Sequence, residues 1–108
     1  MSYSHRIADL QLAERLEAFG AVLIEGPKWC GKTTTAEQMS KSVIKMQDTE
    51  MQEEYAATAA SKPSLLLMGE TPRLIDEWQD APVLWDAVRT MVDKRQVPGQ
   101  FILTGSTV

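Results

Sequence analysis

The sequence has one cysteine, one histidine and no apolar run that approaches the roughly 20 residues of a membrane span. The single cysteine, Cys30, excludes an internal disulfide and a cysteine-only zinc site, which fits a reducing compartment. Around His5, the lone histidine, neither a metal site nor a Ser/His/Asp triad can be built with any specificity. We therefore expect a cytoplasmic protein that does not span a membrane.

The sequence also lacks a basic excess and a signal peptide. The formal net charge is -4, the opposite of the basic surface that non-specific nucleic-acid binding requires, so direct binding of nucleic acid by this segment is not expected. The N-terminus does not combine a charged head with a continuous apolar stretch, which argues against export. A chain of 108 residues has room for one domain with a single modest core.

Apolar patterns along the chain alternate between helical and strand spacing. Helices are predicted over residues 7–19, 33–42 and 50–60, as a short turn over 63–67, and from Pro82 to a stop at Pro98-Gly99. Strands are predicted over residues 21–25, 42–46, 73–77 and 100–104, the first of them buried on both faces. This alternation indicates an α/β fold with a mostly parallel sheet.

A glycine-rich loop follows the first predicted strand. Gly26-Pro27-Lys28-Trp29-Cys30-Gly31-Lys32-Thr33 matches G-x-x-x-x-G-K-[ST] at every fixed position, directly between a predicted strand and a predicted helix. Such a loop surrounds a β-phosphate with backbone N–H groups, while the helix presents its positive end. The segment is therefore predicted to bind ATP with Mg²⁺.

Individual loop residues have separate expected roles. Lys32 should reach the β- and γ-phosphate oxygens, and the Thr33 hydroxyl should take one Mg²⁺ coordination position. Thr34, in the first helical turn, is a candidate contact to the α-phosphate. The predicted nucleotide-binding residues are Gly26, Pro27, Lys28, Trp29, Cys30, Gly31, Lys32, Thr33 and Thr34.

Two acids end the strand predicted over residues 73–77. Asp76 and Glu77 fall at the C-terminal edge of the sheet, where ligands bind in folds of this kind. Asp76 is expected to orient a Mg²⁺-bound water, and Glu77 to polarise the water that attacks the γ-phosphate. An acidic strand end that faces solvent is the alternative, and the loop upstream favours the catalytic interpretation.

Hydroxyl residues end the last predicted strand at the same edge. Thr104 or Ser106 would sense the γ-phosphate or hold the attacking water, and the sequence does not separate the two from each other or from an ordinary turn. Of the nearby aromatic residues, Trp78 is expected to pack beneath the site and Trp85 to lie in the core.

Taken together, residues 21–35, 72–79 and 101–106 resemble a prokaryotic group of AAA-type P-loop ATPases. The resemblance implies a three-layer P-loop NTPase fold. It assigns Lys32 and Thr33 to phosphate and Mg²⁺, Asp76 and Glu77 to metal orientation and catalysis, and the 104–106 segment to sensing. It also implies that relatives continue into a further strand, a helical lid and a C-terminal domain, so residues 1–108 are expected to be an incomplete ATPase core.

Two expectations follow from the difference between residues 1–108 and these longer relatives. The strand over residues 21–25 should lie at an exposed sheet edge, which favours self-association or marginal stability. No arginine finger can be assigned, because Arg89 and Arg95 lie on a predicted helix with no argument that directs them at a nucleotide. Since a missing finger lowers turnover by roughly 10³ to 10⁵, slow hydrolysis or none is expected from this segment alone.

Two other functions are compatible with the loop. A small P-loop kinase would transfer the γ-phosphate to a metabolite, but the acidic pair supplies a water activator and no second basic cluster is present to hold an acceptor. A binding module would use nucleotide only to switch a conformation that a partner reads. The sequence does not distinguish ATP from GTP or name a process.

Overall fold

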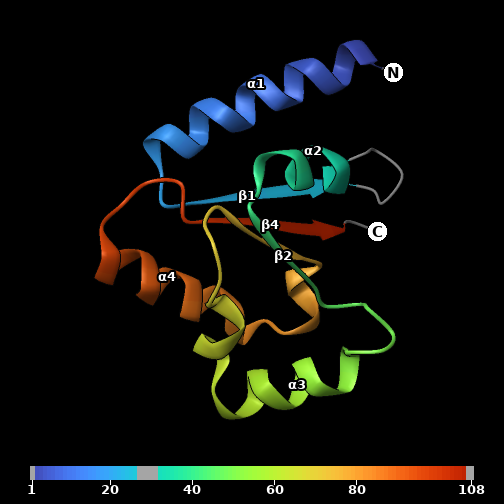
Figure 1. Cartoon of the computed structure of the whole chain (residues 1–108), viewed down its shortest axis with the longest axis vertical. Coiled ribbons are helices and arrows are strands. Elements are labelled where there is room, and N and C mark those ends of the chain that lie inside the picture. Colours follow the sequence, from blue (N-terminus) through green and yellow to red (C-terminus); the bar gives the residue numbers. More distant parts are fainter. Residues whose placement is uncertain (1, 27–31, 107–108) are drawn as a thin grey trace.

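The computed structural model describes the backbone of residues 2–26 and 32–106 and the side chains of residues 10–26 and 34–106. Every predicted helix and strand is present in it, with most bounds close to those expected. The first helix begins at Ser2 rather than Ile7, and the second ends at Met39 rather than Ser42. The elements, in chain order (Figure 1), are α1 (Ser2–Ala18), β1 (Ala21–Gly26), α2 (Lys32–Met39), β2 (Ser42–Lys45), α3 (Gln52–Ser61), η2 (Pro63–Leu67), β3 (Arg73–Asp76), η3 (Trp78–Asp80), α4 (Val83–Arg95) and β4 (Phe101–Ser106).

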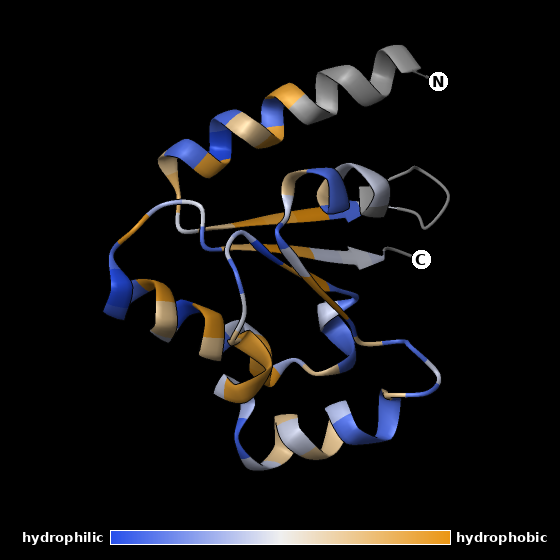
Figure 2. Cartoon of the chain, viewed as in Figure 1, coloured by the Kyte–Doolittle hydropathy of each residue, from blue (hydrophilic) through white to orange (hydrophobic). Residues whose placement is uncertain are grey.

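The strands form one parallel sheet in the order β1-β4-β3-β2. The two central strands, β3 and β4, are the most buried, and Leu74, Ile75 and Ile102 are fully enclosed. Figure 2 shows hydrophobic residues along β1 and the first half of β4, between the helices, and polar residues toward the ends of both strands. A parallel sheet built from alternating helices and strands confirms the predicted α/β fold.

Helices cover both faces of the sheet, which gives three layers (Figure 1). On one face, α1 and α2 pack through Leu12, Leu16 and Ala36 onto the sheet. On the other face, α3, η2 and α4 enclose a larger cluster. The principal side chains of that cluster are Ile44, Met46, Leu66, Leu67, Ile75, Leu84, Val88, Phe101 and Leu103.

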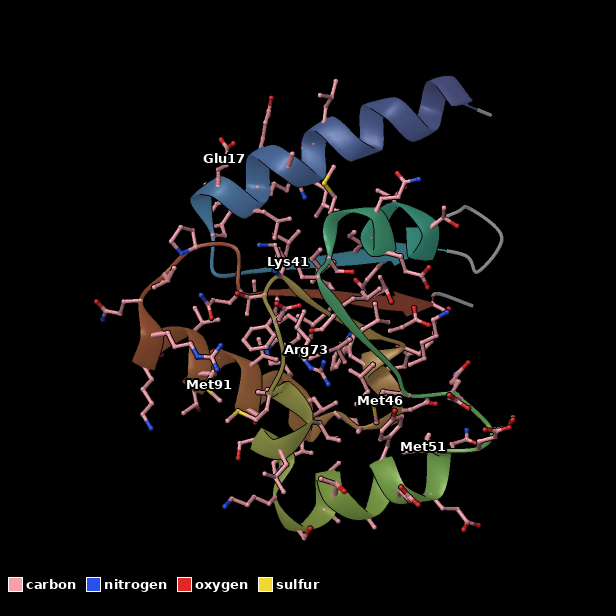
Figure 3. All side chains as sticks on the ribbon, viewed as in Figure 1. Glu17, Lys41, Met46, Met51, Arg73 and Met91 are labelled. Carbon is pink, nitrogen blue, oxygen red and sulfur yellow. The ribbon has the colours of Figure 1, made fainter. Side chains whose placement is uncertain are left out.

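A partly buried arginine fastens the segment that precedes β3. Arg73 Nε donates to the Leu66 carbonyl at 2.8 Å, and its Nη1 donates to Ser42 Oγ at 3.1 Å, so one side chain joins η2 to the start of β2 (Figure 3). Burial lowers the pKa of the Arg73 guanidinium. Arg73 is the first residue of β3 and Asp76 is the last, so these contacts lie at the N-terminal ends of the strands, away from Asp76.

Two predictions about burial were wrong. Trp85 is 41% exposed, because α4 faces the sheet with Leu84 and Val88, while Trp85 lies on the flank of that face toward β1. β1 is only partly buried, with Val22 enclosed and Glu25 exposed. Both differences have one physical cause: β1 is an edge strand, paired within the described residues with β4 alone.

Candidate functional site

The C-terminal edge of the sheet gathers the residues that the sequence singled out. The register places Gly26 beside Ser106 and Asp76 beside Thr104, so β1, β4 and β3 end next to one another. Because all strands are parallel, the chain leaves β1 at this edge and returns in α2, which begins at Lys32. The end of β1 at Gly26 and the acid that ends β3, Asp76, therefore lie at the same edge of the sheet.

Several predicted loop assignments lie outside the described part of the chain. These are the assignments to Pro27, Lys28, Trp29, Cys30 and Gly31, and those to the side chains of Lys32 and Thr33. Gly26 is the last residue of β1, and Thr34 is exposed in the first turn of α2. The nucleotide contacts of all these residues stay predictions.

Thr104 links the two acids. Its side chain is fully buried, and its hydroxyl donates to Asp76 Oδ1 at 2.5 Å while accepting the backbone N–H of Glu77 at 3.3 Å. One hydroxyl from β4 thus fixes both the Asp76 carboxylate and the peptide that follows it. The structure separates Thr104 from Ser106 in this way: Thr104 supports the turn beneath the acids, whereas Ser106 lies at the end of the strand and is partly exposed.

Glu77 is buried with only 4% of its surface exposed, and its backbone turns sharply out of the strand. Its φ of 60° and ψ of 52° lie in the left-handed region, which costs roughly 1–2 kcal/mol for a residue with a side chain. Both carboxylate oxygens accept hydrogen bonds, from Ser106 Oγ to Oε1 and from Gln79 Nε2 to Oε2, each at 2.6 Å. A solvent-facing strand end does not have this burial, so that alternative is wrong for Glu77.

Sequence reasoning assigned no role to Gln79. This side chain lies in η3, the short turn that follows Glu77, and its Nε2 donates a hydrogen bond to the Glu77 carboxylate. Trp78 in the same turn packs against Trp85, with ring centroids 5.0 Å apart, and its Nε1 lies against Gly105 of β4. The only signal in the sequence is that Gln79 is a polar residue two positions after Glu77. That signal alone does not distinguish a glutamine that contacts the acid from one that lies on the surface.

A lysine at the end of β2 adds positive charge beside Asp76, its neighbour in the sheet register. Lys45 Nζ lies 2.8 Å from Glu37 Oε1 of α2. The hydrogen bond and charge of Glu37 raise the pKa of Lys45 above its ordinary value of 10.5, with smaller contributions from Asp76 and Asp48. The raised pKa means that the pair favours the folded state below pH 10.5 and loses its contribution as the pH rises further, and its exposure keeps the effect small.

The arginines that lacked an assignment lie away from the acids. Arg89 pairs with Asp86 at 3.1 Å on the exposed side of α4. Arg95 Nη1 donates to Gln100 Oε1 at 2.8 Å just before β4 begins, at the sheet edge opposite the acids. Neither contact directs a guanidinium toward the predicted phosphate position.

Comparison with known families gives the identity of the fold. A family model described as an AAA domain matches residues 18–108. The chain belongs to this AAA domain family. Its parallel α/β sheet is accordingly the P-loop NTPase type of fold, and nucleotide binding is the general function that the family indicates.

Two curated relatives align with almost the whole AAA domain chain. Both are described as uncharacterized proteins, one from Mycobacterium bovis and one from Mycobacterium tuberculosis, and each is 32% identical over 107 residues. The alignment covers 98% of this chain but only 24% of each relative, so the chain spans about a quarter of their length. No solved structure matches the chain significantly. Within the residues described, no helix is both long and apolar enough to cross a membrane.

Proposed function

We propose that this AAA domain binds ATP together with Mg²⁺ through residues 26–34, and that the complete protein hydrolyses the nucleotide. The observation that carries the proposal is the buried network in which Thr104 and Ser106 of β4 hold Asp76 and Glu77, beside the strand end from which the loop leaves. Carboxylate and hydroxyl oxygens are hard ligands of the kind that Mg²⁺ prefers. When bound, the ion would neutralise charge that develops on the phosphates.

Each residue of the site has a separate proposed role. Lys32 and the backbone of the loop would bind the phosphates. Thr33 would coordinate Mg²⁺, Asp76 would orient a water bound to the ion, and Glu77 would accept the proton of the attacking water. The burial of Glu77 supports its role, because a general base acts best where bulk water is excluded. Thr104 holds the Asp76 and Glu77 pair in register.

ADP release distinguishes hydrolysis from the competing functions. ADP formed in buffer with ATP and Mg²⁺ alone supports an ATPase, whereas ADP that forms only on addition of a metabolite acceptor supports a kinase. Nucleotide binding without turnover, and without any effect of Glu77→Gln, supports a conformational switch. Because turnover without an arginine finger is slow, the assay is run with the protein in excess over ATP.

We also predict that the chain self-associates through β1. This edge strand borders an apolar groove of about 340 Å³, lined by residues that include Phe19, Leu23, Trp85 and Val92. A second copy paired antiparallel about Leu23 would place Glu25 opposite Ala21, so the acids would not face each other. Unpaired edges of this kind recruit another chain.

Sedimentation velocity across a concentration series tests the association. The wild type should show a concentration-dependent dimer, and Phe19→Glu at the groove should weaken it at least about tenfold, because Phe19 is 60% exposed and the change adds charge to the apolar surface. The exposed Leu65→Glu, on η2, is the control and should leave the dimer intact. A wild type that stays monomeric at all concentrations would contradict the prediction.

A further inference from the structure

The Glu77 carboxylate is held from two sides by neutral donors. Ser106 Oγ reaches Oε1 from the end of β4, and Gln79 Nε2 reaches Oε2 from the η3 turn, both at 2.6 Å. Hydrogen bonds to a carboxylate are shorter and stronger than those between neutral groups, and they gain further strength where water is excluded. These two contacts therefore constrain how the carboxylate is turned.

The Gln79 side chain is itself fixed. Its Oε1 is buried against β4, where a Cβ added to Gly105 would come within 3.2 Å of it and within 3.0 Å of Trp78 Nε1. Only the amide nitrogen can face Glu77, because an amide oxygen would place two acceptors 2.6 Å apart. Within the described part of the chain, Gln79 Oε1 and Trp78 Nε1 have no hydrogen-bond partner. Burial of an unpaired amide oxygen is unfavourable, so the contact with Glu77 must help to hold this conformation.

We propose that Gln79 is the positioning residue of the catalytic acid, and that it sets the direction in which Glu77 faces the attacking water. The inference rests on the ATPase function proposed above. Glu77 has a left-handed backbone, so the regular geometry of β3 does not determine where its carboxylate points. Ser106 and Gln79 supply that constraint from two different elements. Misplacement of a reacting group by 1 Å costs roughly 10²-fold in rate, so loss of one contact is expected to affect turnover rather than binding.

Gln79→Met tests the proposal, because methionine keeps the length of the side chain and removes the donor. In single-turnover assays, the rate of ATP hydrolysis should fall about 10- to 100-fold. The dissociation constant for ATP with Mg²⁺ should stay within about twofold, since Gln79 acts only through Glu77. Gln52→Met, an exposed glutamine at the start of α3, is the matched control and should change neither value.

The double variant separates positioning from general stability. In a Glu77→Gln background, Gln79→Met should lower the residual rate by less than about twofold, because residues that act as a unit are not additive. An equal loss in both backgrounds, or a single variant with the wild-type rate, would overturn the proposal. A wild type that binds ATP but never turns it over would overturn the positioning role as well.

A spectroscopic measurement needs no turnover. In nucleotide-free ¹⁵N-labelled protein, the Gln79 side-chain amide protons should be shifted downfield and protected from exchange, and Glu77→Ala should remove both effects. Random-coil shifts with fast exchange in the wild type would show that the contact is absent, even if ATP is hydrolysed. A protected amide together with no nucleotide binding would instead reject the proposed ATPase function, and the catalytic role of Gln79 with it.

Discussion

Glu77→Gln is expected to lower ATP turnover by about 10²- to 10⁴-fold, the contribution typical of a general base. The amide cannot accept the proton of the attacking water. It can keep both neighbours of the carboxylate, since its carbonyl oxygen can accept from Gln79 Nε2 while its NH₂ group donates to the Ser106 hydroxyl, so the loss of rate reports the loss of the base. Nucleotide affinity should remain within about twofold, because the phosphate contacts are assigned to residues 26–34.

Single-turnover hydrolysis and equilibrium binding, measured on the same preparations, report the two effects separately. Glu53→Gln makes the same chemical change on the exposed face of α3 and serves as the control. Its rate should equal that of the wild type. If Glu77→Gln hydrolysed ATP at the wild-type rate, another group would have to activate the water, and the burial of Glu77 would have a purely structural meaning.

Phe101→Ala is expected to destabilise the fold by about 3–5 kcal/mol. Phe101 is fully buried at the start of β4, a central strand, and the Arg95 guanidinium lies 5.9 Å from its ring centroid. The lost free energy of unfolding has two parts, the apolar contacts that are removed and the cost of the cavity that remains between the sheet and α4. Domains of this size are stable by only about 5–15 kcal/mol, so a large share of the total would be lost.

The chain contains its own control for this change. Phe19, its other phenylalanine, is 60% exposed, and Phe19→Ala should cost less than about 1 kcal/mol. Urea unfolding of both variants, followed by circular dichroism at a protein concentration low enough for the chain to be monomeric, gives the comparison. Similar losses for the two variants would mean that β4 is not the centre of the core.

Much of the fold was predictable because local patterns and tertiary structure agree. The apolar runs that became β1, β3 and β4 end in glycine or in acids, and helical patterns lie between the strands. The edge position of β1 was also predicted, through the family resemblance. Helical spacing of Trp85 with Val88 did not reveal that the neighbouring edge leaves Trp85 exposed, since periodicity locates a face but not what covers it.

The acids of the candidate site were predictable, but the contacts that hold them were not. Asp76 ends an apolar strand and Glu77 follows it, a pattern that is visible in the sequence. The roles of Thr104 and Ser106 depend on which strand lies beside β3, because adjacency decides which hydroxyl meets which carboxylate. Gln79 required the left-handed turn at Glu77, which reverses the chain and brings a residue two positions later against the acid.

Mg²⁺-dependent binding of a fluorescent ATP analogue, compared between the wild type and Lys32→Ala with GTP as a competitor, tests the central claim most directly. Saturable wild-type binding that requires Mg²⁺ and weakens at least about tenfold in Lys32→Ala is the predicted result, because Lys32 supplies the point charge for the phosphates. Absence of binding to the wild type, or equal binding to both proteins, would contradict the assignment of residues 26–34 as a nucleotide site.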